Sequence, residues 1–101
     1  MELVFDKETI ALDKKRLINH LWKLIPMREH AEDWEAQLLI VSEEISGLGV
    51  VLNKEADLNF LVLLSKLEGL SSSFCKENFM LYRGTIFRCI NLLAEVLRDY
   101  E

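Results

Sequence analysis

Apolar residues recur along this chain with the period of the α-helix, 3.6 residues per turn. In two seams, over residues 34–52 and 79–100, large apolar residues alternate steps of three and four positions. Two further helical patterns cover residues 13–25 and 58–69. Four helices with short connections predict an all-α fold, an antiparallel bundle of about four helices, in a single domain that spans residues 1–101.

Residues that start and stop helices set the predicted boundaries. Asp13 is a good cap for the first helix, and Pro26, which lacks a backbone donor, predicts its end or a kink. Asn53 is expected as a turn and cap before the third helix, and the fourth is expected to run unbroken from about Phe74 almost to the end. Before Asp13 we expect a short extended or irregular N-terminal segment, with a helix that already begins after Asp6 as the alternative. The third helix is expected to carry an apolar face made of Leu58, Leu61, Val62, Leu64 and Leu67.

Half of the residues are hydrophobic, and the mean hydropathy of +0.12 is high for a small soluble domain. Both seams have further apolar residues beside them, and a chain of this size has a large surface for its volume. We therefore expect a protein partner to cover part of this surface, in a homodimer or a hetero-complex. Gly84, in mid-helix, predicts a close contact from another helix, inside the bundle or across an interface. The residues expected at the interface are Met80, Gly84, Phe87, Ile90, Ala94, Leu97, Leu39 and Val50.

The expected function is that of a small protein–protein interaction module, such as an adaptor, an assembly subunit or a small inhibitor, that acts as an oligomer. No nucleophile–base pair or phosphate-binding glycine loop is recognisable in the sequence, so we expect no enzymatic activity and no cofactor.

Acidic residues on the second and third helices support an alternative function. Carboxylates from paired helices can hold Mg²⁺, which prefers oxygen ligands. The candidates for such a site are Glu32, Glu35, Glu43, Glu44 and Asp57. Residues 42–67 faintly resemble the all-alpha nucleotide pyrophosphohydrolases, in which a glutamate pair is followed by a third acid one turn on, and an acid precedes an aspartate by three residues. That resemblance implies a Mg²⁺-dependent hydrolase with these acids as ligands.

The chain departs from the pyrophosphohydrolase pattern at two positions. Gly47 stands where the third acid would follow Glu44, and Lys54 stands three residues before Asp57. A lysine there would bring a positive charge to the metal site. The acids are therefore expected mainly to solvate the outer helix faces, with the hydrolase as the alternative.

The net charge of −5 disfavours nucleic acid, because neutralisation of phosphates supplies most of the affinity of nucleic-acid binders. A nucleic-acid-associated accessory role is the second alternative. The acidic start is unlike a signal peptide, and no apolar run approaches the roughly 20 residues that span a bilayer. Cys75 and Cys89 would lie about 21 Å apart on one helix, too far for a disulfide. We therefore expect a cytoplasmic protein with reduced, buried thiols and no membrane contact.

Overall fold

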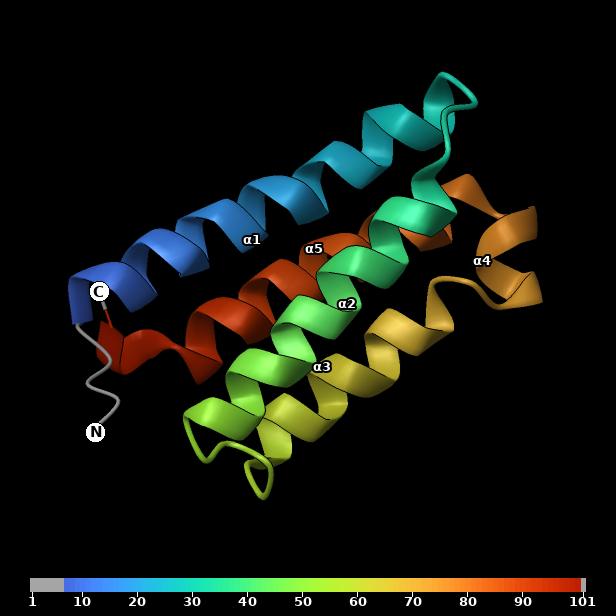
Figure 1. Cartoon of the computed structure of the whole chain (residues 1–101). Helices are drawn as coiled ribbons and strands as arrows, with labels where there is room; N and C mark the ends of the chain where they lie inside the picture. The colour runs from blue at the N-terminus through green and yellow to red at the C-terminus, as the bar shows by residue number, and fades with distance from the viewer. Residues whose placement is uncertain (1–6, 101) are drawn as a thin grey trace.

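The structure is a computed structural model that describes residues 7–100, which form four long α-helices, one short α-helix and a final 3-10 turn (Figure 1). In chain order these are α1 (Lys7–Glu29), α2 (Trp34–Val51), α3 (Leu58–Gly69), α4 (Ser73–Glu77), α5 (Phe79–Val96) and η1 (Arg98–Tyr100). The long helices alternate in direction and form a bundle with extents of 46 × 24 × 22 Å. The predicted all-α antiparallel bundle is confirmed.

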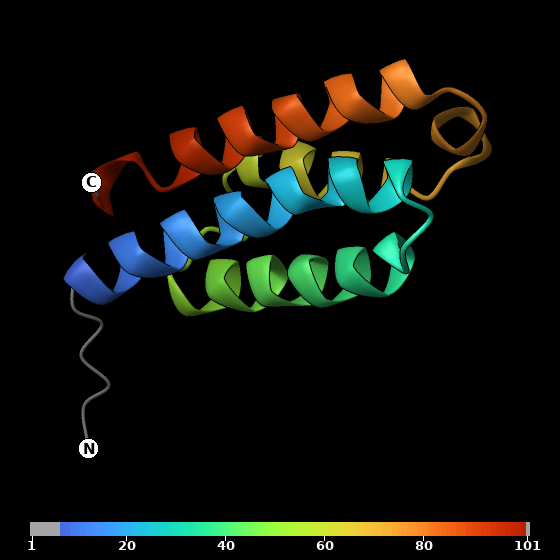
Figure 2. The same cartoon turned by 90° about the horizontal axis from the view of Figure 1, so that it is seen from above.

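The four long helices enclose one core. α1 packs against both α2 and α5 (Figure 2), and α3 packs chiefly against α5, while the contact between α2 and α3 is less extensive. Both predicted seams face the core, which includes Val41, Ile45, Ile86 and Leu93. None of the helices between residues 7 and 100 combines the length and apolar character that crossing a membrane requires.

Side-chain caps explain where four helices begin. Asp33, Asp57, Ser72 and Asn78 each accept a hydrogen bond from a backbone amide in the first turn that follows. The bond from the amide of Asn59 to Asp57 is 2.8 Å long. These oxygens satisfy amides that have no partner within their own helix. The cap of α3 is thus Asp57, and not Asn53 as predicted.

Asn53 instead ends α2. Its φ of 57° is left-handed, and the amide of Lys54 donates to the carbonyl of Gly49 at 2.8 Å. The end of α1 has the same form, with Ala31 at φ 55° and the amide of Glu32 donating to the carbonyl of Met27 at 2.8 Å. Both ends are Schellman motifs, in which one left-handed residue lets the last carbonyls find donors.

The first helix is longer at both ends than predicted. α1 begins at Lys7, so residues 7–12 are helical and not extended; the first six residues of the expected irregular segment lie outside the described residues. The helix begins this early because Ile10 is buried in the bundle, and its burial stabilises an additional helical turn. α1 also continues through the exposed Pro26 to Glu29, because buried residues before it and Arg28 after it hold this turn against the bundle.

The fourth predicted helix is two helices. Asn78 has an extended backbone, with φ −130° and ψ 100°, and serves as both the C-cap of α4 and the N-cap of α5. The amide of Leu81 donates to its side chain at 3.1 Å. This competing side-chain bond favours a break over a continuous helix. The break turns α4 across the end of the bundle (Figure 1).

The core contains one tyrosine and two cysteines, whose side chains can ionise in water. The buried Tyr82 hydroxyl donates to the carbonyl of Leu24 at 3.0 Å, and burial raises the pKa of Tyr82 above its ordinary value. Cys75 and Cys89 are both free and buried, which confirms the expected reduced core thiols. Burial raises the pKa of Cys89 to about 12, so this thiol is neutral and unreactive.

Candidate functional site: an interaction surface around α3

The outer side of α3 is unusually apolar for a solvent-facing helix. Leu58 is 74% exposed and Leu61 is 49% exposed, although charged residues normally occupy such positions. Ser65 and Gly69 continue this side with small residues. We call Leu58, Leu61, Ser65 and Gly69 the α3 face. The buried residues of α3 are instead Phe60, Leu63 and Leu67, so the predicted apolar face was wrong at Leu58 and Leu61.

A groove of about 480 Å³ between α2 and α3 borders one side of the α3 face. Leucines line it, among them Leu39, which is 61% exposed. Three glutamates stand around these leucines, and we call the whole the acidic groove: Leu38, Leu39, Leu64, Leu67, Glu35, Glu43 and Glu68. The exposed Leu39 and the carboxylates around it make this groove both apolar and negatively charged.

α2 contributes a regular stripe to the acidic groove. Leu39, Glu43, Ser46 and Val50 follow one another by four, three and four positions, which places them on one side of the helix. Val50 is exposed like Leu39, so this stripe has an apolar residue at each end.

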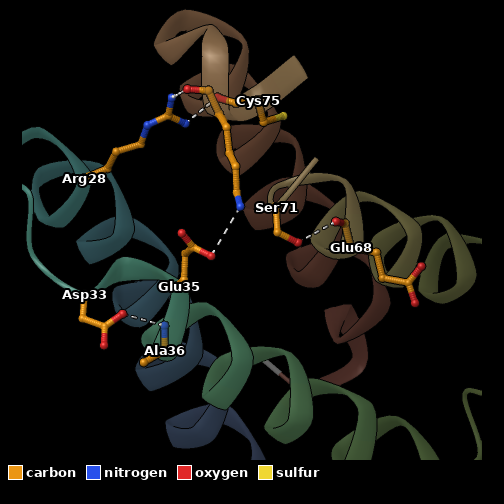
Figure 3. Close-up of polar contacts among 8 residues, drawn as sticks. Arg28, Asp33, Glu35, Ala36, Glu68, Ser71 and Cys75 are labelled. Atoms are coloured by element: carbon orange, nitrogen blue, oxygen red, sulfur yellow. Dashed lines mark hydrogen bonds and ion pairs between the residues drawn. The ribbon is translucent and has the colours of Figure 1, made fainter. Parts of the chain in front are cut away.

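Polar contacts fix one end of the acidic groove (Figure 3). The Lys76 ammonium lies 3.6 Å from the carboxylate of Glu35, and Ser71 Oγ donates to the backbone carbonyl of Glu68 at 3.1 Å. Among residues 7–100, neither the Glu43 nor the Glu68 carboxylate has an ion-pair partner within 4.0 Å. Their negative charges are therefore available to a partner.

Arg28 positions the short helix that carries Lys76. Its guanidinium donates to the carbonyls of Cys75 and Lys76, the latter at 2.7 Å, near the end of α4. It also lies 4.4 Å from the ring centroid of Tyr82 and 5.5 Å from that of Trp34. These contacts join α1, α2, α4 and α5 at one point. Sequence reasoning missed this role, because the contacting residues are far apart along the chain.

The other side of the α3 face has the opposite charge. A groove of about 380 Å³ between α3, α4 and α5 includes Phe74, Leu81 and Lys66, and an adjoining hollow adds Met80, Gly84 and Arg88. Phe74 is 78% exposed. We call these six residues the basic strip. Apolar side chains here stand beside two cations, where the acidic groove has glutamates.

The structure divides the predicted interface residues into two groups. Ile90 and Leu97 are 9% and 2% exposed, so they belong to the core of the single chain. Phe87 and Ala94 are half-buried, and Phe87 packs against Trp22 with ring centroids 5.0 Å apart. The stripe beside the seam of α5 thus packs largely inside the bundle. The other predicted residues are exposed, with Met80 and Gly84 on the basic strip and Leu39 and Val50 on the α2 stripe.

Gly84 has no close helix contact within the chain. Among the described residues, no atom beyond its own helix backbone and chain neighbours lies within 4 Å of the position that a Cβ would take. The predicted contact inside the bundle is therefore wrong, and only the contact across an interface stays a prediction. Phe74 and Leu81 were missed as candidates, although both are apolar residues outside the seam of the predicted fourth helix.

The acids of the alternative metal site do not converge. Asp57 caps α3, Glu44 pairs with Arg16 of α1, and Glu35 pairs with Lys76. Glu43 borders the acidic groove, and the exposed Glu32 lies between α1 and α2. Over residues 7–100, no three His, Cys, Asp or Glu side chains form a group that could hold a metal ion.

Chemically, this arrangement offers contact area and charge. The exposed leucines and aromatics can bury apolar surface against another protein. The unpaired glutamates make one side of the α3 face negatively charged, and the cations make the other side positively charged. Comparisons with protein families, curated proteins and solved structures find no match to this chain.

Proposed function

We propose that this chain is a protein–protein interaction module whose docking surface is the α3 face together with the acidic groove. The single observation that supports this most is the exposure of Leu39 in the same groove as the carboxylates of Glu43 and Glu68, with the exposed Leu58 and Leu61 on the adjoining α3 face. Burying a leucine-sized side chain stabilises by about 1.5–3 kcal/mol. A partner that covers these leucines gains a substantial part of its affinity from them.

The chemistry of the surface favours one kind of occupant, an apolar helix that carries lysine or arginine. An amphipathic helix docks by laying its apolar stripe in a groove between helices. The acidic groove supplies leucines for that stripe and glutamates for flanking cations. Such charge complementarity speeds association and rejects acidic competitors.

A titration with designed peptides tests this proposal. One synthetic helical peptide carries a leucine stripe flanked by lysines, and its matched control carries glutamates in place of the lysines. In ¹⁵N-labelled protein, the lysine peptide is expected to shift the backbone amides of Leu39, Glu43 and Leu64, less so at high salt because exposed ion pairs are screened. The double variant E43K/E68K is expected to weaken binding roughly tenfold, since each exposed pair contributes up to about 1 kcal/mol.

Two results would refute the proposal. One is equal binding of the two peptides, which would show that the glutamates do not select the partner. The other is a set of shifted amides on α1 and the far side of α5, which would place docking elsewhere.

A further inference from the structure

We infer that the occupant of this surface is a second copy of this chain, paired about a twofold axis that runs along α3, so that the acidic groove of each copy lies against the basic strip of the other. This inference rests on the proposed function, because it names the partner for the same docking surface.

Charge complementarity within one chain is the first support. Lys66 and Glu68 are two residues apart on α3, so they project about 200° apart around the helix. Lys66 lies in the grooves beside α5, with Arg88 in the adjoining hollow, whereas Glu68 and Glu43 lie in the groove beside α2. The chain thus carries both halves of a complementary interface, one on each side of the same helix.

The positions of the charges also select the symmetry. A twofold axis along α3 exchanges the two sides of the α3 face, so glutamates of one copy meet cations of the other. A twofold axis perpendicular to α3 would instead place the acidic groove of one copy against the acidic groove of the other, so glutamates would face glutamates. Isologous pairing is the commonest arrangement of identical chains. Of the two isologous pairings, only the one with its axis along α3 brings opposite charges together. The two α3 helices then run parallel.

The apolar and small residues fit this arrangement. Ser65 and Gly69 form the C-terminal half of the α3 face, where small side chains let two helices approach closely. No atom outside the local helix backbone lies within 4 Å of a Cβ placed at Gly69 or Gly84, among residues 7–100. Pairing also covers Leu58, Leu61 and Phe74, which a single chain leaves in water. An aromatic side chain as exposed as that of Phe74 is typical of an interface anchor, since aromatic residues are enriched at protein–protein interfaces.

Mass measurement with charge-reversed variants tests the pairing. Two variants each reverse one side, E43K/E68K in the acidic groove and K66E/R88E on the basic strip. Light scattering behind size exclusion is expected to show a dimer for the wild-type chain over a wide dilution series, and monomers for each variant alone. In an equimolar mixture of the two variants every contact joins opposite charges, so a heterodimer is expected to form.

A matched control separates local pairing from total charge. The double variant K15E/K23E changes the net charge as K66E/R88E does, but on α1, which packs against α2 and α5. It is expected to stay dimeric. Circular dichroism of all variants checks that the exposed or half-buried substitutions leave the bundle folded.

Three outcomes would overturn the inference: a wild-type chain that is monomeric at every concentration, a dimer that survives both reversals, or reversed variants that do not restore each other. The proposed function is judged separately with the K66E/R88E variant, whose acidic groove is intact. If the wild-type chain is monomeric but this variant binds the lysine peptide in its groove, only the inference of a second copy fails. If the variant binds no peptide there, the proposed function fails as well.

Discussion

Gly49 gives the sharpest test of how α2 and α3 pack. Its backbone is ordinary helix with negative φ, so the glycine is not required for conformational freedom. It is required for space, because a Cβ at this position would overlap the ring of Phe60, with even the Cε1 atom only 2.6 Å away. Phe60 is buried, and its ring cannot simply swing into solvent. We therefore expect Gly49→Ala to destabilise the protein.

The magnitude follows from two opposing effects. Alanine gains up to about 1 kcal/mol over glycine in a helix interior. Overpacking a core typically costs about 1–3 kcal/mol, and an overlap with an aromatic ring belongs at the upper end of this range. The net expectation for Gly49→Ala is a loss of about 1–2 kcal/mol in the free energy of unfolding. Gly47, two residues earlier, is exposed with no neighbour within 4 Å among the described residues, so Gly47→Ala should gain about 0.5–1 kcal/mol.

Urea unfolding followed by circular dichroism measures both variants under the same conditions, with the midpoint and slope compared to wild type. The prediction is opposite signs for two glycines on the same turn. The double variant Gly49→Ala/Phe60→Leu adds a coupling test, since a smaller side chain leaves room for the methyl group and should recover part of the loss. If Gly49→Ala were as stable as wild type, Phe60 could not be packed against the backbone of α2 as described.

Three further predictions address other contacts. Ala31→Gly should stabilise the protein by about 0.5–1 kcal/mol in urea unfolding, because a left-handed backbone strains alanine but not glycine; a destabilised variant would contradict the Schellman geometry. Arg28→Lys should lose about 1–3 kcal/mol in the same assay, since a lysine cannot reproduce two guanidinium bonds to neighbouring carbonyls and its stacking on Tyr82; unchanged stability would show that these contacts contribute nothing. Stability should fall as pH rises above about 9, the ordinary value for a thiol, because unfolded Cys89 then ionises while the folded thiol, with a pKa of about 12, does not. The slope is about 1.4 kcal/mol per pH unit for that group between the two values, and Cys89→Ala should remove it, so an unchanged slope would argue against burial of the thiol.

The periodic seams made the bundle predictable. Over residues 34–51 and 79–96 burial of one face repeats with the helix period, so position in the sequence reveals which side is inside. Local signals were less decisive where they competed with distant contacts. Asp13 looks like a helix start, but burial of Ile10 extends α1 before it, and Pro26 does not end the helix.

The candidate surface was harder to predict, because an apolar residue in the core and one at an interface look alike in a sequence. Leu58 and Leu61 share helical spacing with the half-buried Leu64, yet the bundle turns Phe60 and Leu63 inward and leaves Leu58 and Leu61 outside. Only the crossing of α3 with its neighbours decides between the two faces. The same holds for Ile90, which α5 turns into the core.

The tie made by Arg28 has a consequence for how this end of the molecule moves. One guanidinium holds the last turn of α1, the start of α2 and the backbone of α4, so none of these segments can fray alone without breaking the contacts of the others. We therefore expect these segments to open as one cooperative unit, whose amides exchange with solvent together and not in sequence order. Because Lys76 of this unit holds Glu35, its opening also releases a third carboxylate at the mouth of the acidic groove. Local opening at this end of the bundle would thereby raise the negative charge that the proposed docking surface presents.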